Sequence, residues 1–324
     1  SRSSAASDVY KRQGSGLRVE GLWGHGQDNN LQEGHARMTR TISVSELLLY
    51  HDCERAWKYR YHDRLVKVSQ GRNPAMASGT AVHYIVEHQA TERPGEMLRP
   101  DDAHALALEC LNDEFRNLEY PDAEKTKSQV DKYLPGVMRA VGKIPEDVWA
   151  QDWHVEWDLD TILRTTQADS EEVRLIGRPD LWTMNDGVLE VLDVKTTKTD
   201  PMTYMLWFPQ IRYYAMMLQD MHPEAVVQYR YLCVPTTGDK PAPQSPAWIF
   251  TPKQVRRARE EAERLLSRMD PEMTEMRALR RCDWCEFKTL CTLDITGGDP
   301  MSLAKEEFAT RLSREEREKQ VFED

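Results

Sequence analysis

The sequence predicts an α/β fold in which a mixed central sheet is flanked by helices, with a helical portion on the N-terminal side. Two observations support this fold class. Apolar residues recur at helical spacing within residues 44–141, whereas residues 153–234 are rich in the β-branched and aromatic residues that favour strands. A helical segment at 202–220 interrupts the strand-rich part, and an amphipathic basic segment follows at 252–269. Helices and strands in this order pack as layers around a core.

Length and composition restrict the class of protein. The chain has 324 residues, of which 40% are hydrophobic, as in ordinary globular domains. It contains no run of the roughly 18 apolar residues that a membrane span needs and no secretion signal. We therefore expect a cytoplasmic protein without a membrane partner. The net charge of −11 excludes a simple nucleic-acid coat protein, but it is compatible with an enzyme whose metal site needs carboxylates.

Three segments are expected along the chain. Residues 1–37 are rich in Ser, Gly, Arg, Asn and Gln, lack a hydrophobic period and precede Met38. This composition predicts a disordered tail or a non-native extension. Residues 38–298 are expected to form the folded domain. The many charges of residues 299–324 predict a C-terminal tail or an exposed helix.

A capping box marks the start of the first helix. Ser43 and Glu46 have the required spacing and precede three leucines, so we expect a helix that starts near Val44 and carries Cys53. The other expected elements follow from periodicity and residue type. They are helices at residues 79–89, 101–118 and 124–141, and strands at 153–159, 173–184, 188–196 and 226–234.

Aromatic and basic residues alternate after this capping signal. Trp57, Tyr59 and Tyr61 lie among several arginines and lysines. Such a pattern is suited to stacking unpaired bases while the cations hold phosphates. It is equally typical of a helix that packs its aromatic residues inward and leaves its charges in solvent. The pattern alone leaves both interpretations open.

A predicted hairpin brings two carboxylates together. Asp186-Gly187 is a strong signal for a two-residue type I′ turn, because both central residues of that turn need positive φ. Counting outward from the turn places Asp180 directly opposite Asp193, with Cβ atoms roughly 4.5–5.5 Å apart. Lys195 is two residues beyond Asp193 and points to the same face. A solvated surface is the alternative, but opposed like charges destabilise a hairpin unless a cation compensates them.

These residue types suit the hydrolysis of a phosphodiester. The reaction needs a metal ion that polarises the phosphate and lowers the pKa of the attacking water, and a cation that positions the water or stabilises developing charge. We expect Asp180 and Asp193 to bind Mg²⁺ or Mn²⁺. We expect Lys195 to provide the positive charge that positions the water or stabilises developing charge.

The segments Arg178-Pro179-Asp180 and Asp193-Val194-Lys195-Thr196 resemble the paired motifs of the PD-(D/E)xK nuclease superfamily, with Asp in place of the commoner Glu, as in RecB-like members. The resemblance implies a restriction-endonuclease-like core. Gly79-Thr80-Ala81-Val82-His83 resembles the helix that gives RecB-like nucleases a histidine metal ligand, which implies that role for His83. Gln210 and Tyr214 resemble the family's Gln-x-x-x-Tyr motif, which implies that they belong to the catalytic site and orient DNA or the lysine.

Four cysteines suggest a second metal centre. Cys282, Cys285 and Cys291 form a C-x2-C-x5-C pattern, and Cys53 is the one cysteine of the expected first helix. Spacing alone does not separate zinc from iron and sulfide. The resemblance to the AddB nuclease domain and to iron–sulfur CRISPR-associated exonucleases implies a [4Fe–4S] cluster that joins the two ends of the domain. The other cysteines, Cys110 and Cys233, are expected to be small buried residues.

Together these features predict a metal-dependent DNA exonuclease that prefers single-stranded or frayed DNA, in recombination, repair or CRISPR-type DNA processing. The sequence has no Walker P-loop, so ATP-driven unwinding would require a helicase or recombination partner. Two alternatives remain. One is a nuclease that acts on RNA or branched DNA. The other is a non-catalytic, metal-stapled DNA-binding accessory protein.

Overall fold

A computed structural model provides the structure of the protein. It describes residues 40–67, 74–116, 123–155, 159–165, 172–197, 210–238, 247–275, 282–283 and 285–310. The expected N-terminal extension, residues 1–37, lies outside the described residues, as do Met38 and residues 311–324. Within the described part, no helix is both long and apolar enough to cross a membrane.

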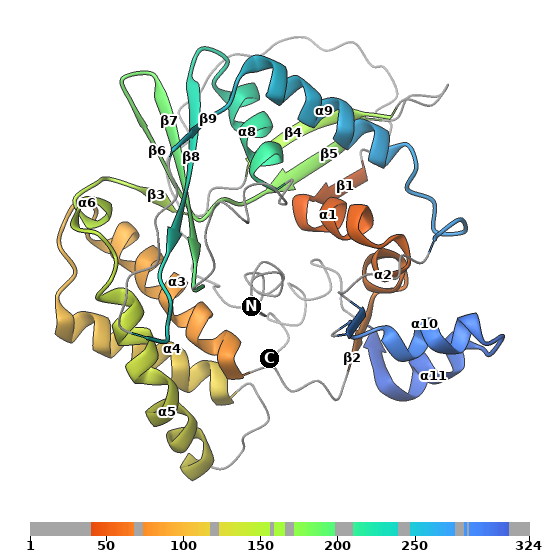
Figure 1. The fold of residues 1–324 in the computed structure, drawn as a ribbon, viewed down its shortest axis with the longest axis horizontal. Coiled ribbons are helices and arrows are strands. Elements are labelled where there is room, and N and C mark those ends of the chain that lie inside the picture. Colours follow the sequence, from red (N-terminus) through yellow and green to blue (C-terminus); the bar gives the residue numbers. More distant parts are fainter. Residues whose placement is uncertain are drawn as a thin grey trace, which may run out of the picture.

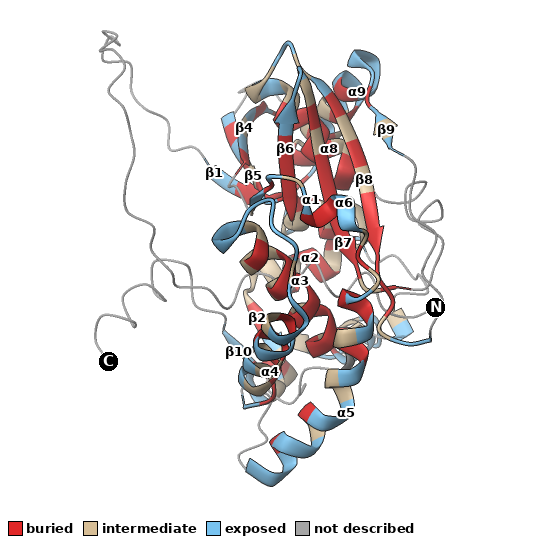
Figure 2. Cartoon of the chain, turned by 90° about the vertical axis from the view of Figure 1, so that its left-hand side faces the viewer, coloured by how far each residue is buried: buried red, intermediate tan, exposed pale blue. Residues whose placement is uncertain are grey.

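The main sheet is mixed, as the sequence predicts, and lies between helices (Figure 1). Its strands in spatial order are β3 (His154–Val155), β6 (Leu181–Asn185), β7 (Val188–Lys195), β8 (Val226–Cys233) and β9 (Trp248–Ile249). β7 and β8 are parallel, whereas the other neighbours are antiparallel. Because helices cover both faces, β7 is buried along most of its length, and Figure 2 shows the central strands as largely buried.

Two smaller sheets complete the β structure. One contains β1 (Arg40–Ser43), β5 (Glu172–Gly177) and β4 (Leu159–Arg164), in that spatial order. The other pairs β2 (Leu65–Lys67) with β10 (Phe308–Thr310) in antiparallel register. This second pairing joins segments from opposite ends of the described chain.

The two faces of the main sheet contact different helices, and alternate residues of each strand supply the two cores. On one face, Val191 and Tyr229 pack with α1 (Val44–Asp52), α8 (Gln210–Met221) and α9 (Pro252–Leu266). On the other face, Leu192 and Leu232 pack with a helical layer. That layer comprises α3 (Pro74–Glu92), α4 (Pro100–Arg116), α5 (Ala123–Val141) and α6 (Glu146–Trp149).

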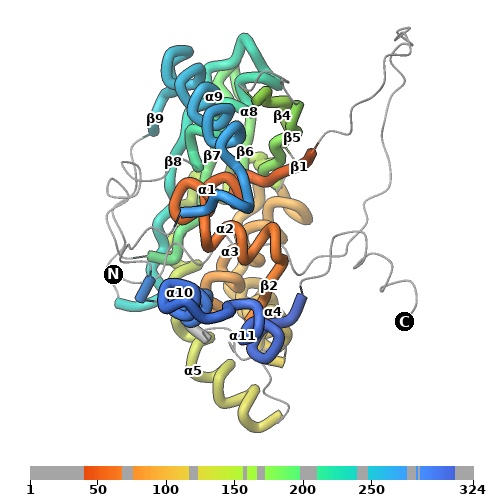
Figure 3. The backbone as a smooth tube through the Cα atoms, turned by 90° about the vertical axis from the view of Figure 1, so that its right-hand side faces the viewer, coloured from red at the N-terminus to blue at the C-terminus, as the bar shows by residue number. Residues whose placement is uncertain are grey.

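The remaining helices connect the N-terminal and C-terminal parts. They are α2 (Glu54–Trp57) with a π-helical turn at Lys58–His62, α10 (Lys288–Ile295) and α11 (Pro300–Glu307). α11 and β10 lie within the segment expected as a tail or exposed helix, residues 299–324. Figure 3 shows α10 and α11 beneath α2, with α9 lying above α1.

Several expected elements differ in detail from the structure. The first helix starts at Val44, and the Ser43 side chain accepts a hydrogen bond from the Glu46 amide (3.1 Å), but the helix ends before Cys53. The single strand expected at 173–184 is two strands in different sheets, β5 and β6, because the chain leaves the ladder between them. β4 extends beyond the strand expected at 153–159. Of the helix expected at 202–220, residues 202–209 lie outside the described residues.

Trp57 and Tyr59 do not face solvent, so the base-stacking interpretation is wrong for these two residues. Their side chains are 2% and 4% exposed and belong to the core. Trp57 donates a hydrogen bond to Glu46 (3.1 Å) and packs edge-on against Tyr50. Tyr61 is half-buried. The charges of this segment instead remain near the surface, which is the second interpretation that the sequence allowed.

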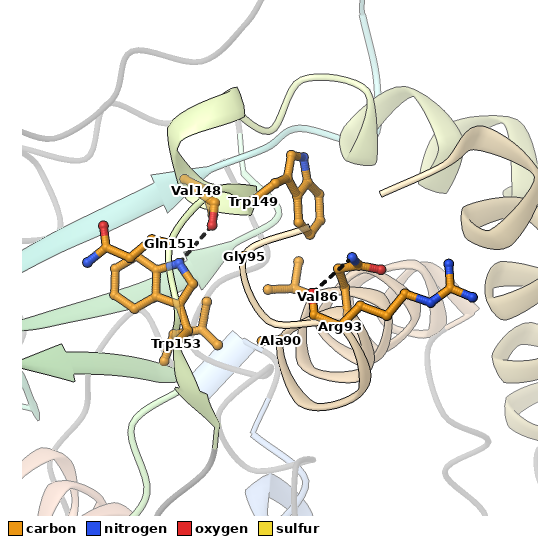
Figure 4. A pocket seen from close by; sticks show the side chains of 10 residues that line it. Val86, Ala90, Arg93, Gly95, Val148, Trp149, Gln151 and Trp153 are labelled. Atoms are coloured by element: carbon orange, nitrogen blue, oxygen red, sulfur yellow. Dashed lines mark hydrogen bonds between the residues drawn. The ribbon is translucent and has the colours of Figure 1, made fainter. Parts of the chain in front are cut away.

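A cavity of about 10 Å³ lies where α3 and α6 approach β6 (Figure 4). The Trp153 indole crosses this region and donates to the Val148 carbonyl (2.8 Å), while Gln89 donates to the Arg93 carbonyl (3.3 Å). This volume is about that of one water-sized sphere. The cavity is therefore a packing defect of the helical layer and has no room for a substrate.

Candidate active site and cysteine cluster

The hairpin of β6 and β7 has the predicted turn and the predicted register. Asp186 and Gly187 have φ values of 49° and 77°, as a type I′ turn requires. Asn185 pairs with Val188, and the ladder continues outward to Leu181 opposite Leu192. Asp180 directly precedes β6 and lies one residue beyond the last paired position. The predicted register is therefore confirmed up to Leu181 and Leu192, the residues next to the two carboxylates.

Asp180 is buried at the open end of this hairpin, with 2% exposure. Its Oδ2 accepts a hydrogen bond from the Val194 amide (2.8 Å) and lies 3.4 Å from His83 Nδ1. Asp180 lies one residue beyond the β6–β7 ladder, and its carboxylate accepts the Val194 N–H in place of a strand neighbour. This bond fixes the Asp180 side chain against β7.

Asp193 forms an ion pair with Lys195 on the same face of β7. Lys195 Nζ lies 2.5 Å from Asp193 Oδ2, and both side chains are less than 5% exposed. Lys195 Nζ also lies 5.9 Å from the centroid of the Tyr231 ring on β8. A buried pair of this kind is stable only while both partners are present, because either charge alone would have lost its hydration without compensation.

His83 reaches this site from α3, and a close approach of helix and strand makes that possible. A Cβ atom added to Gly79 would lie 3.1 Å from Thr196 Oγ1, just beyond the end of β7. Glycine at this position lets α3 pack tightly there. His83, one turn further along α3, is 6% exposed and faces Asp180. Four of the predicted site residues thus form two buried pairs, His83 with Asp180 and Lys195 with Asp193.

Gln210 and Tyr214 lie on the first turns of α8 and contact each other. Gln210 Nε2 donates to the Tyr214 hydroxyl (3.2 Å), and that hydroxyl donates to the carbonyl of Arg178 (3.1 Å). Both side chains are buried, with 5% and 4% exposure. Tyr214 thereby contacts the backbone two residues before Asp180.

The donor types fit a hard divalent ion, but the ligands do not form a ready-made cage. Carboxylate oxygens suit Mg²⁺ or Mn²⁺, and an imidazole nitrogen suits transition ions. Among the described residues, however, no three His, Cys, Asp or Glu side chains are arranged as a metal-binding group. In this arrangement the charge of Asp193 is balanced by Lys195, and the Asp180 oxygen is held by Val194.

The four predicted cluster cysteines form no disulfide, and all are half-buried. In the described part of the chain they are not arranged as a metal-binding group. The pKa of Cys291 is raised to about 12, mainly by burial and also by the thiols of Cys285, Cys53 and Cys282, which places these three cysteines in its electrostatic surroundings. Cys233 is fully buried in β8, as expected, whereas Cys110 is only partly buried.

Contacts around these cysteines join the two ends of the domain directly. Arg55 forms an ion pair with Asp294, and Arg60 forms one with Glu286. The Phe287 ring packs between Tyr59 and Phe308, at centroid distances of 5.6 and 5.7 Å. The pairing of β2 with β10 extends the same junction. The docking of the C-terminal segment is therefore supported by side-chain packing and ion pairs as well as by any bound metal.

Two contributors to the site were not recognised in the sequence. They are Gly177, which lies against the Tyr214 ring, and the Arg178 carbonyl, which accepts the Tyr214 hydrogen bond. A glycine at the end of a strand and just before a carboxylate motif is a visible signal, but its partner on α8 is more than thirty residues away. Only the tertiary structure identifies that contact.

Similarity to known proteins is detected at the level of a family. The family model described as the PD-(D/E)XK nuclease superfamily matches residues 41–292. No curated protein matches the sequence. Among solved structures, a Eubacterium rectale protein titled "Putative exonuclease" is 12% identical, with a TM-score of 0.42, over 80% of this chain and 92% of the other. The crystal structure of SSO0001 is 13% identical, with a TM-score of 0.29, over 64% and 94%.

Proposed function

The chain belongs to the PD-(D/E)XK nuclease superfamily, and from this premise we propose that it is a divalent-metal-dependent deoxyribonuclease that removes nucleotides from DNA ends. The observation that carries this proposal is the buried group at the end of the β6–β7 hairpin. Two carboxylates, a lysine and a histidine are buried there as two ion pairs, supplied by α3, the residue before β6, and β7. Burying so many ionisable groups is costly, so such clusters mark functional sites.

In the proposed mechanism, Asp180, Asp193 and His83 hold Mg²⁺ or Mn²⁺. When bound, the ion polarises the scissile phosphate and lowers the pKa of a water molecule. Lys195 orients the attacking water and stabilises negative charge that develops on the phosphate. Its position beside Asp193 suits this role, because the ion pair of 2.5 Å holds the ammonium group next to a proposed metal ligand.

We further propose that Cys53, Cys282, Cys285 and Cys291 bind a [4Fe–4S] cluster. Support comes from the shared thiol environment, since four nearby cysteines of the same partial burial match the donor set of such a cluster. The ion pairs of Arg55 and Arg60 hold the segments that carry them. Zinc, with no iron or sulfide after anaerobic purification, would reject the cluster while leaving the four-ligand site.

The proposed substrate is single-stranded or frayed DNA, and α9 offers a surface for its backbone. Lys253, Arg257 and Arg264 are exposed at positions four and seven residues apart, so they form a stripe on one side of α9. The described part of the chain gives none of them an acidic partner. This α9 stripe spans about 16 Å. In a chain of net charge −11, such unneutralised cations favour contact with phosphates.

The proposal places the enzyme in DNA recombination, repair or CRISPR-type processing, with unwinding left to a helicase or recombination partner. The direct test is product mapping with end-labelled single-stranded DNA, blunt duplex and matched RNA, in Mg²⁺, Mn²⁺ or chelator. We expect metal-dependent loss of terminal nucleotides from single-stranded DNA. Preferential cutting of RNA would reassign the substrate, and no cleavage of any substrate by folded, metal-loaded protein would support a binding role instead.

A further inference from the structure

We infer that Gln210, Tyr214 and Gly177 form a brace that positions Asp180, and that this pair of α8 side chains does not contact the substrate. The inference rests on the proposed function in one respect, that Asp180 is a metal ligand. It extends that function, because it assigns the Gln210–Tyr214 pair the role of positioning a metal ligand.

The brace is a continuous chain of contacts. Gln210 Nε2 donates to the Tyr214 hydroxyl (3.2 Å), which donates to the Arg178 carbonyl (3.1 Å). Arg178 lies two residues before Asp180, in the stretch between β5 and β6 that has no strand neighbours. At the other end of this stretch, Asp180 Oδ2 accepts from the Val194 amide (2.8 Å). A hydrogen bond thus holds the stretch at each end.

Gly177 makes room for the brace. A Cβ atom at this position would lie 2.7 Å from Tyr214 Cε1 and 3.1 Å from a methyl carbon of Val44. The Tyr214 ring cannot easily move away, because it is 4% exposed and Val44 is 1% exposed. Any larger residue must displace the ring, the strand end or both. Glycine is therefore required here by close approach.

Hydrogen-bond capacity argues against a direct contact between Tyr214 and DNA. A tyrosine hydroxyl has one proton, and in this structure that proton is directed at the Arg178 carbonyl. A phosphate oxygen can only accept. Tyr214 could bind a phosphate only after the bond to Arg178 had broken, and its burial further separates it from any strand at the surface.

The test compares Tyr214→Phe with a matched control on the next residue. Tyr213 is also buried, and its hydroxyl makes no hydrogen bond to the described residues. Tyr213→Phe therefore removes a buried hydroxyl without breaking a hydrogen bond within that part of the chain. Three quantities are measured in each protein. They are hydrogen exchange of the Val194 amide without metal, the dissociation constant for Mn²⁺, and the dissociation constant for single-stranded DNA in chelator.

We expect Tyr214→Phe to speed exchange at Val194 about fivefold, which corresponds to the roughly 1 kcal/mol of one net hydrogen bond. Mn²⁺ binding should weaken about tenfold, as when residues that orient metal ligands are removed. DNA binding should not change, and Tyr213→Phe should match wild type in all three. Gly177→Ala should act in the same direction as Tyr214→Phe. If Gly177→Ala does not fold, the comparison of Tyr214→Phe with Tyr213→Phe is sufficient.

Weaker DNA binding with unchanged exchange at Val194 would overturn the inference and make Tyr214 a substrate contact. Unchanged exchange together with unchanged Mn²⁺ binding would also overturn it, because the brace would then hold nothing. These outcomes do not depend on cleavage. If wild-type protein fails to cut DNA, the nuclease proposal fails while the effect on Val194 can still be present.

Discussion

The buried pair of Asp193 and Lys195 allows a sharp test of the metal site. Lys195→Met keeps a similar side-chain volume but removes the charge, so the change reports on electrostatics more than on packing. The Asp193 carboxylate would remain less than 5% exposed without its partner 2.5 Å away. Breaking a buried ion pair in this way costs about 3–5 kcal/mol. We expect the free energy of unfolding in chelator to fall by about that amount.

A divalent ion should then restore stability, because it replaces the missing positive charge beside Asp193. At a Mn²⁺ concentration of about 100 times the dissociation constant, binding to the folded state adds about 2.7 kcal/mol. We expect Lys195→Met to gain more than wild type at the same Mn²⁺ concentration, since wild-type Lys195 already neutralises the carboxylate. Cleavage should nevertheless remain strongly reduced, because the metal cannot also orient the water.

The assay is urea denaturation in chelator and at several Mn²⁺ concentrations. Lys125→Met serves as the control, because Lys125 is exposed on α5 and far from the hairpin in sequence. Two results would refute the reasoning. One is a Lys195→Met protein as stable as wild type in chelator, and the other is an equal gain from Mn²⁺ in both proteins.

Three further outcomes are expected. Asp180→Asn should lower cleavage at least about 100-fold while the protein stays folded by circular dichroism, because losing a metal ligand removes several kcal/mol of transition-state stabilisation; wild-type rates would contradict the assignment. Cys291→Ser should lower bound iron and sulfide after anaerobic purification, and Cys110→Ser should not. Replacing the α9 stripe with Gln should reduce the slope of log K against log salt by about 2 for single-stranded DNA, and an unchanged slope would exclude this surface. The control for net charge replaces three ion-paired arginines, Arg99, Arg116 and Arg174.

The sequence predicted the part of the site that depends on local rules. A turn type and a two-residue strand period are sufficient to set the register of the hairpin and to place Lys195 on the same face as Asp193. This part of the geometry follows whether or not the family is known. The same rules failed between β5 and β6, where a continuous strand was expected. There the chain leaves the ladder, and the Asp180 side chain bonds to Val194 in place of its backbone.

Long-range contacts could not be read from the pattern. Alternating aromatic and basic residues fit a surface platform or a buried face, and only the packing of Trp57 and Tyr59 into the core decides between them. The pairing of β2 with β10 is similar, because each strand has only three residues and carries little signal. The cysteine spacing showed that a fourth ligand was needed, whereas the family resemblance was required to favour iron and sulfide over zinc.

The hairpin gives each of its two carboxylates a separate stabilising neighbour, although the sequence analysis expected that a cation would compensate both. Asp193 has Lys195, whereas Asp180 has a backbone N–H and the nearby imidazole of His83. A divalent ion that binds both acids must therefore compete with interactions that already stabilise them, which lowers its affinity. The site gains in return a defined arrangement before metal and substrate arrive, because each side chain is held by a buried neighbour. Removal of the Lys195 charge should therefore raise metal affinity but lower catalysis. Removal of the Tyr214 hydroxyl should lower both metal affinity and catalysis.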